Sequence, residues 1–472
     1  MSSIADDPPI HRLSHDLLLH IFEQNAHMFA DDNALITTCI TSQVCQTWRY
    51  LLLATPFLWG RLLDFDVLAR STGDGYWGDE LSRNPREEED YANQPQALHF
   101  LKTIQDNLHR LEILVVNLDA VEYVRHHGSW NKLVSLPAPQ LQSFDLTVLS
   151  DRDGRRTPFG GVYFSPPASF ADDAPRLRKF RAVQFAFNLQ APWVCCLREV
   201  YIEHSTSLSA TLNALATTEN LECLGLHAVW VAEDDEHLQT VHLHKLKELH
   251  LDSLHPSVCG ILLDHLRIPS ECALQYTLRL STHWFADNVD NNFETALTAV
   301  IRRLSECARG YFLKKVPINL LFHYDENLLC ITTHVQDDFN GFHLHIESPL
   351  LPHPKQIMAT FLSEFTLPEF SHVTELHLEI AFNDKNISLL PFLGCLSSIR
   401  TLTTCCWDPD FFKFLKEKLD SPRSVLPLLR TIKMQKPRPP PSLSVENYLK
   451  DVDLSEFMDA LDGYPVEVVF SR

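Results

Sequence analysis

The stretch LKELHL, residues 246–251, decides how most of this chain folds. Side chains of a β-strand alternate between its two faces, so Leu249 and Leu251 are expected to point together into a core. The pattern of this stretch is an apolar residue, two other residues, an apolar residue, one other residue and an apolar residue. Its recurrence along the chain predicts repeated units that each contribute one strand. The spacing returns at LEILVV (111–116), LQSFDL (141–146), LRKFRA (177–182), LREVYI (197–202), LECLGL (221–226), VTELHL (373–378), IRTLTT (399–404) and LRTIKM (429–434).

Amphipathic helices are predicted between these strands by apolar residues at helical spacing. They fall at TSLSATLNALAT (206–217), PSVCGILLDHLRI (256–268), NFETALTAVIRRLSECA (292–308), PKQIMATFLSEF (354–365) and PDFFKFLKEKL (409–419). Alternating strands and helices predict a parallel sheet, and stacked units of this length predict an irregular α/β solenoid of the leucine-rich-repeat type. We assign residues 97–434 to it, with further strands at 316–324 and 341–348 and an interruption allowed near 310–370.

Three segments flank the predicted solenoid or separate its parts. Residues 71–96 are polar and carry the acidic run Glu87–Asp90, so they are predicted to form a flexible acidic loop. The proline-rich residues 436–442 are interpreted as a stiff connector, with a polyproline II ligand for an SH3-like domain as the alternative. Residues 443–472 are predicted to hold a C-terminal helix and strand.

Composition narrows the classes of function. The chain has 472 residues and a formal net charge of −21, so nucleic acid and anionic membranes are not expected among its partners. Its sequence lacks the GxxxxGK[ST], GxSxG and HExxH motifs. Its twelve cysteines form no CxxC pair and read as small buried thiols, and the N-terminus has no apolar signal segment. We therefore expect a protein of the cytoplasm and/or nucleus.

Residues 8–60 have the pattern of a few short helices. Ser14 is a suitable N-cap for a helix that begins at His15. So short a segment carries more large apolar groups than it can bury, and the excess should face a partner or the following domain. One apolar stripe comprises Leu17, Leu18, Ile21 and Phe22, and another comprises Ile40, Val44, Trp48, Leu51 and Leu52.

Three sequence blocks in this segment resemble an F-box of the type common in large fungal families. LSHDLLLHIF (13–22) is similar to Leu-Pro-x-Glu-Leu-Leu-x-x-Ile-Phe, with Ser14 and Asp16 in place of the Pro and the Glu. VCQTWR (44–49) matches Val-Cys-x-x-Trp-Arg, and TPFLW (55–59) matches Thr-Pro-x-Leu-Trp. The whole chain resembles fungal F-box proteins that have a leucine-rich-repeat-like C-terminal region.

The resemblance implies a substrate-recognition subunit of an SCF-type (Skp–cullin–F-box) ubiquitin ligase. Such a subunit is not an enzyme: it binds a Skp-type adaptor, through it a cullin–RING ligase, and a target protein through the solenoid. A scaffold that acts without ubiquitination is the second interpretation, and a metal-dependent or hydrolytic enzyme is a remote third. By position, the resemblance assigns adaptor contact to Ile10, Leu13, Leu17, Leu18, Ile21, Phe22, Val44, Trp48 and Leu58.

The polar positions of the predicted strands should share one concave face, which we interpret as the surface for the target protein. Its excess of carboxylates favours a target with a basic segment. Glu248, His250 and Asp252 are also three plausible metal ligands, but a polar strand face gives the same pattern, so no metal and no cofactor is predicted. The predicted target-binding residues are Lys179, Arg181, Glu199, Tyr201, Glu203, His227, Glu248, His250, Asp252, Glu375, His377 and Glu379.

Overall fold

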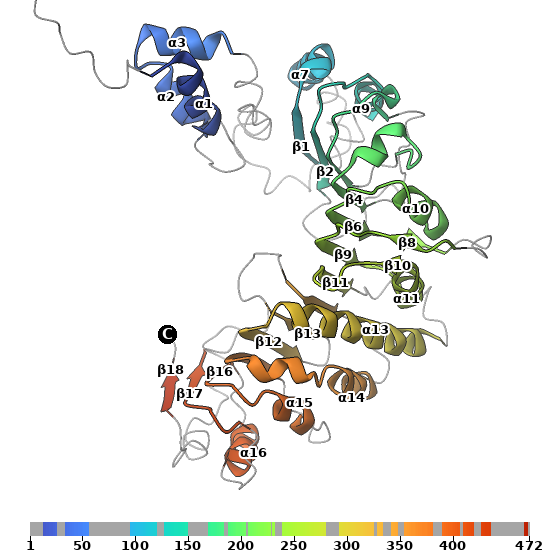
Figure 1. The fold of residues 1–472 in the computed structure, drawn as a ribbon, viewed down its shortest axis with the longest axis vertical. Coiled ribbons are helices and arrows are strands. Elements are labelled where there is room, and N and C mark those ends of the chain that lie inside the picture. Colours follow the sequence, from blue (N-terminus) through green and yellow to red (C-terminus); the bar gives the residue numbers. More distant parts are fainter. Residues whose placement is uncertain are drawn as a thin grey trace, which may run out of the picture. The chain divides into compact units, whose positions relative to one another are not determined.

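The computed structural model divides the chain into two compact units, Met1–His204 and Ser205–Arg472, which are described separately below (Figure 1). Helices and the sheet strands make up most of the part that it describes. The described residues are 13–25, 34–55, 95–119, 127–149, 169–183, 187–203, 206–227, 229–231, 238–279, 292–324, 328–333, 341–347, 354–380, 389–405, 409–419, 426–435 and 467–470.

Three short helices occupy the described N-terminal residues: α1 (His15–Asn25), α2 (Ala34–Thr41) and α3 (Gln46–Leu53). The predicted cap is confirmed, because the hydroxyl of Ser14 accepts a hydrogen bond from the backbone N–H of Leu17 at 3.3 Å. Helices α1 and α3 share a small core of Leu18, Phe22 and Leu52.

The second apolar stripe predicted in this segment is not one helix. Ile40 belongs to α2, Val44 lies in the connecting turn, and Trp48 belongs to α3. The hydroxyl of Ser42 donates to the carbonyl of Cys39 at 2.6 Å, which helps to end α2. Cys45 then caps α3, because its sulfur accepts a hydrogen bond from the N–H of Trp48 at 3.5 Å.

The first unit also contains four parallel strands. Hydrogen bonding joins β1 to β2, β2 to β3 and β3 to β4 in chain order, with Ser143 opposite Lys179 and Lys179 opposite Glu199. Phe144 and Phe180 stack beneath these strands with ring centroids 5.4 Å apart. The elements are α7 (Pro95–Asn107), η3 (Leu108–Arg110), β1 (Ile113–Asp119), α9 (His127–Val134), β2 (Ser143–Leu149), η4 (Ser169–Asp172), β3 (Lys179–Val183), η5 (Pro192–Cys196) and β4 (Glu199–Glu203).

The second unit continues the alternation of strands and helices (Figure 1). Its elements are β5 (Thr206–Ser207), α10 (Leu208–Leu215), β6 (Cys223–His227), β7 (Val229–Trp230), β8 (Val241–His242), β9 (Glu248–Asp252), α11 (Pro256–His265), β10 (Leu266–Arg267), β11 (Ala273–Arg279), α13 (Phe293–Lys314), β12 (Asn319–Tyr324), β13 (Leu328–Thr332), β14 (His343–Glu347), α14 (Pro354–Glu364), η6 (Pro368–His372), β15 (Glu375–Ile380), α15 (Leu390–Cys395), β16 (Thr401–Thr404), α16 (Pro409–Leu419), β17 (Thr431–Met434) and β18 (Glu467–Phe470).

The sheet of the second unit has the order β6-β9-β11-β14-β13-β12-β15-β16-β17-β18. Every neighbouring pair is parallel except those of β13, which runs antiparallel to both β12 and β14. The sheet thus stays continuous at this point while the order of its strands reverses. Helices α11, α13 and α14 lie next to one another along one face of the sheet (Figure 1).

The α/β fold class and its mostly parallel sheet are confirmed. Each of the nine repeated apolar patterns coincides with one of β1, β2, β3, β4, β6, β9, β15, β16 and β17, an arrangement consistent with a leucine-rich-repeat-like solenoid. In β9, Leu249 and Leu251 are fully buried, whereas Glu248, His250 and Asp252 lie on the more exposed face. The alternation of buried and exposed side chains that the sequence predicts is therefore confirmed in β9.

The segments that flank the repeats are only partly described. Pro95 and Gln96 begin α7 instead of ending the predicted acidic loop, because proline is favoured in the first turn of a helix. Residues 71–94 and 436–442 lie outside the described residues. Within 443–472, β18 pairs in parallel with β17 at the edge of the sheet, and the predicted helix lies outside the described residues. No helix in the described part of the chain combines the length and apolarity needed to cross a membrane.

Leu376→Ala tests the burial that shapes the strands. Leu376 is 1% exposed, so its truncation should lower the free energy of unfolding by about 2–5 kcal/mol. The matched control is Glu375→Ala on the same strand, where the exposed side chain predicts a change within about 0.5 kcal/mol. Urea titration monitored by circular dichroism measures the free energy of unfolding of both variants. Equal effects of the two substitutions would contradict the assignment of Leu376 to the buried face and Glu375 to the exposed face.

Candidate functional site

Large apolar side chains lie exposed on the outside of the three N-terminal helices. Leu17 is 54% exposed, Ile21 41% and Val44 61%, and all three were assigned to adaptor contact from the sequence. A turn of helix separates Leu17 from Ile21, so both lie on one side of α1. The helices therefore present apolar surface that their own core does not cover.

The other residues assigned to adaptor contact lie elsewhere. Leu18 and Phe22 are buried in the small core, and Leu13 and Trp48 are half-buried against it. The rings of Phe22 and Trp48 meet edge to face at 5.2 Å. These four side chains hold the helices together instead of presenting a free surface. Ile10 and Leu58 lie outside the described residues.

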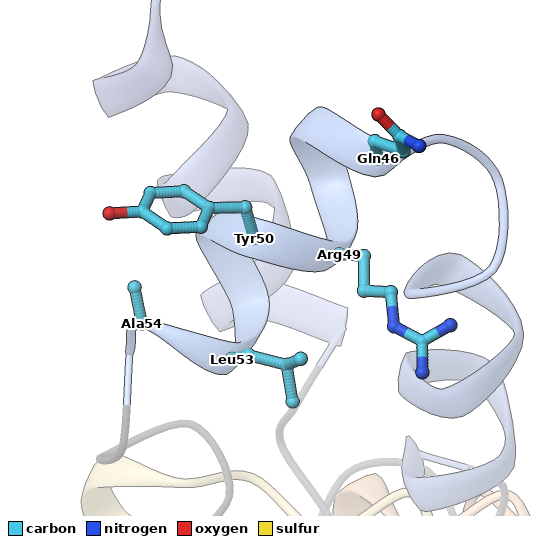
Figure 2. A pocket seen from close by; sticks show the side chains of 5 residues that line it. All are labelled: Gln46, Arg49, Tyr50, Leu53 and Ala54. Carbon is cyan, nitrogen blue, oxygen red and sulfur yellow. The ribbon is translucent and has the colours of Figure 1, made fainter.

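A shallow hollow of about 420 Å³ lies on the outer side of α3, lined by Gln46, Arg49, Tyr50, Leu53 and Ala54 (Figure 2). Tyr50 is 77% exposed and Leu53 60%. Sequence reasoning missed both as surface residues, and also Ile40, which is 62% exposed. Helical spacing could have predicted the exposure of Tyr50 and Leu53, because a helix that buries Leu52 turns both of them to other sides.

On the polar face of the first unit, charged side chains pair across neighbouring strands. Lys179 Nζ lies 2.9 Å from Glu199 Oε2, and the guanidinium of Arg181 lies over the ring of Tyr201 at 5.4 Å. Asp145, missed from the sequence, is the register partner of Arg181. Burial raises the pKa of the Asp145 carboxyl, and the charge of Arg181 partly opposes that shift. The end of β4 carries Glu203.

In the second unit, the trio Glu248, His250 and Asp252 is not the group that the structure brings together. Glu248 Oε2 lies 3.4 Å from His250 Nε2 and 3.7 Å from the sulfur of Cys223 on the neighbouring strand. His250 Nδ1 contacts Gln275 Oε1 at 2.9 Å. Asp252 is exposed and accepts a hydrogen bond from the hydroxyl of Ser253.

Among the remaining residues of the predicted target surface, some contact other side chains and others are exposed. His227 is the register partner of Asp252 and is half-buried. Glu375 is exposed at the start of β15. His377 Nε2 contacts Glu379 Oε1 at 3.0 Å, and Nδ1 of His323, from β12, meets the other oxygen of that carboxylate.

The two histidines change the acidity of Glu379. The hydrogen bond with His323, followed by that with His377, holds the pKa of the Glu379 carboxyl well below its usual range. Its charge is thus retained at any physiological pH. A carboxylate fixed between two imidazoles is a rigid acceptor, which gives this part of the polar face a defined shape.

Among the described residues, two groups on the polar face have the composition of a metal site. Cys223, Glu248 and His250 form one, and the other comprises Cys330, His343 and His345; within each, the possible ligand atoms lie within 4.8 Å of one another. Each group includes a cysteine that was not among the candidate ligands predicted from the sequence. Cross-strand register, which sequence spacing alone does not supply, brings each cysteine to its partners.

A scan against protein-family models finds no family that matches this chain, and a search of curated proteins finds no match. The function of this chain is therefore inferred from its own residues and surfaces.

Glu379→Gln tests the two-histidine arrangement through pH. A carboxyl whose pKa is lower in the folded chain adds stability above its unfolded pKa, near 4.5, and that stability is lost as the pH falls below this value. At pH 7 the substitution should lower the free energy of unfolding by about 1.5–3 kcal/mol. The deficit should narrow progressively below about pH 4.5.

Glu375→Gln, the matched control, changes an exposed carboxyl on the same strand. It should change the free energy of unfolding little, both at pH 7 and below about pH 4.5. Urea titrations of the three proteins at several pH values supply the comparison. A deficit for Glu379→Gln that stays constant down to pH 3.5 would show that the carboxylate is not stabilised as described.

Proposed function

We propose that this chain is the substrate-recognition subunit of an SCF-type (Skp–cullin–F-box) ubiquitin ligase. The observation that carries the proposal is the exposed apolar surface on α1, α2, α3 and the turn between α2 and α3. Leu17, Ile21, Ile40, Val44 and Leu53 are all more than 40% exposed, while the helices bury a separate core. Exposed apolar side chains that gather in one patch mark protein–protein docking sites, and these five are proposed to form such a patch.

The sequence blocks similar to an F-box say which partner this surface fits. Leu17, Ile21 and Val44 stand at positions where that family contacts a Skp-type adaptor, and all three are exposed. Burial of apolar surface contributes roughly 25 cal/mol per Å², so a handful of such side chains supports a stable interface. The apolar side chains supply affinity, and no chemical step is required of them.

The polar face of the solenoid is the proposed surface for the target protein. Several of its carboxylates are exposed, including Asp252 and Glu375, and the whole chain carries a net charge of −21. A target with a basic segment fits such a surface, and association should weaken as the salt concentration rises. With the adaptor bound at the N-terminal helices and the target bound at the polar face, the target lies near the ligase, which raises the effective concentration of its lysines.

The double substitution Leu17→Asp/Ile21→Asp tests adaptor docking. Each change removes about 1.4 kcal/mol of apolar burial, so affinity for a purified Skp-type adaptor should fall about 100-fold or more. His15→Asp is the matched control, because His15 is exposed and lies about 200° around α1 from Leu17. Isothermal titration of the full chain measures affinity, and circular dichroism checks that the helices persist.

Wild-type protein that does not bind the adaptor, or a double variant that binds as well as wild type, would overturn the proposal. Recovery of a neddylated cullin and a target that accumulates on proteasome inhibition separate a ligase subunit from a scaffold that acts without ubiquitination. Adaptor binding without either result leaves the scaffold as the better description.

Glu248→Lys/Asp252→Lys tests the target surface. Reversing two charges on β9 should abolish capture of the target protein that wild type retains, because a basic segment is then repelled. Adaptor binding is the internal control and should be equal in both proteins. Affinity purification with quantitative mass spectrometry gives the readout. An unchanged set of captured proteins would place the target surface elsewhere.

A further inference from the structure

The antiparallel strand β13 brings a thiol to two imidazoles. Cys330 on β13 is the register partner of His345 on β14, and Thr332 is the partner of His343. Since residues two apart on a strand share a face, His343 and His345 both lie on the side of Cys330. The three possible ligand atoms lie within 4.8 Å of one another.

This group is shielded but reachable. Cys330 is 7% exposed, whereas both histidines are half-buried. Leu344 and Ile346 lie fully buried on the opposite face of β14 and fix the direction of its histidines. The rings of His343 and His345 stack with centroids 5.9 Å apart, so they project side by side from the strand.

We propose that Cys330, His343 and His345 bind a single zinc ion. Thiolate sulfur and imidazole nitrogen are the ligands that zinc prefers in proteins. Tetrahedral coordination at ordinary bond lengths separates such ligand atoms by about 3.3–3.6 Å, which small side-chain rotations reach from the observed spacing. Three protein ligands leave one coordination position for water or for a group from a partner.

The surroundings of the two histidines suit this role. Burial lowers the pKa of His345, although Glu347 opposes the shift, and the neutral imidazole is the form that binds metal. Glu347 Oε2 lies 3.4 Å from His345 Nε2, and a carboxylate beside a metal-binding imidazole orients its ring. Burial also raises the pKa of the Cys330 thiol to about 12, so zinc must displace its proton on binding.

The second group, Cys223, Glu248 and His250, is a poorer candidate. Both ring nitrogens of His250 already have partners, Gln275 Oε1 at 2.9 Å and Glu248 Oε2 at 3.4 Å. A metal there would have to break at least one of these contacts. It also offers one imidazole where the group around Cys330 offers two, and imidazole suits zinc better than an additional carboxylate. The second group therefore serves as the control.

Metal titration of the full chain tests the zinc site. Protein treated with a chelator should bind one zinc ion per chain, and one cobalt ion should show the visible bands of tetrahedral Co²⁺ with a thiolate-to-metal charge-transfer band. Cys330→Ser should remove the charge-transfer band. His343→Ala/His345→Ala should weaken zinc binding more than about tenfold. Glu248→Gln/His250→Gln, the matched control, should bind zinc as wild type does.

Three outcomes would overturn the zinc site: no stoichiometric binding by wild type, a thiolate band that persists in Cys330→Ser, or loss of binding in Glu248→Gln/His250→Gln. Circular dichroism of each metal-free variant verifies that its sheet is intact. The site does not depend on the proposed ligase function, because these measurements require neither adaptor nor target.

Discussion

Burial of alternate side chains along short strands is the constraint on which the rest of this structure depends. Leu249, Leu251, Phe322 and Leu344 are fully buried on one face of their strands. Because strand side chains alternate, this burial turns the intervening residues to the opposite face. A shift of one residue in any strand would exchange the two sets, so hydrophobic burial fixes the register as well as the core.

The polar face follows from that constraint, but its chemistry depends on which strands are neighbours. Glu379 gains His323 because β12 pairs with β15, and His345 faces Cys330 because β13 runs antiparallel beside β14. The reversal of strand order between β11 and β15 thus places side chains together that a regular repeat would keep apart. A face that is proposed to bind a partner can therefore also contain a group suited to metal.

Sequence patterns predicted the repeated strands, the helices between them and the Ser14 cap, because each depends on local spacing or on one hydrogen bond. They did not predict β13, whose run LLCIT lacks alternation and has both of its faces largely buried. They also merged Ile40 and Trp48 into one stripe, since apolar spacing continues across the turn where Ser42 ends α2. Cys330 was not predicted to lie beside His345, because cross-strand register, not sequence distance, sets its neighbours.

The exposed apolar side chains of α1, α2 and α3 are proposed to dock a Skp-type adaptor. Amide hydrogen exchange of the full chain with and without purified adaptor tests this docking most directly. Protection on binding should appear in residues 15–25 and 34–53, while β9, at Glu248–Asp252, should exchange at an unchanged rate. Protection confined to the solenoid strands, or no protection at saturating adaptor, would contradict the account.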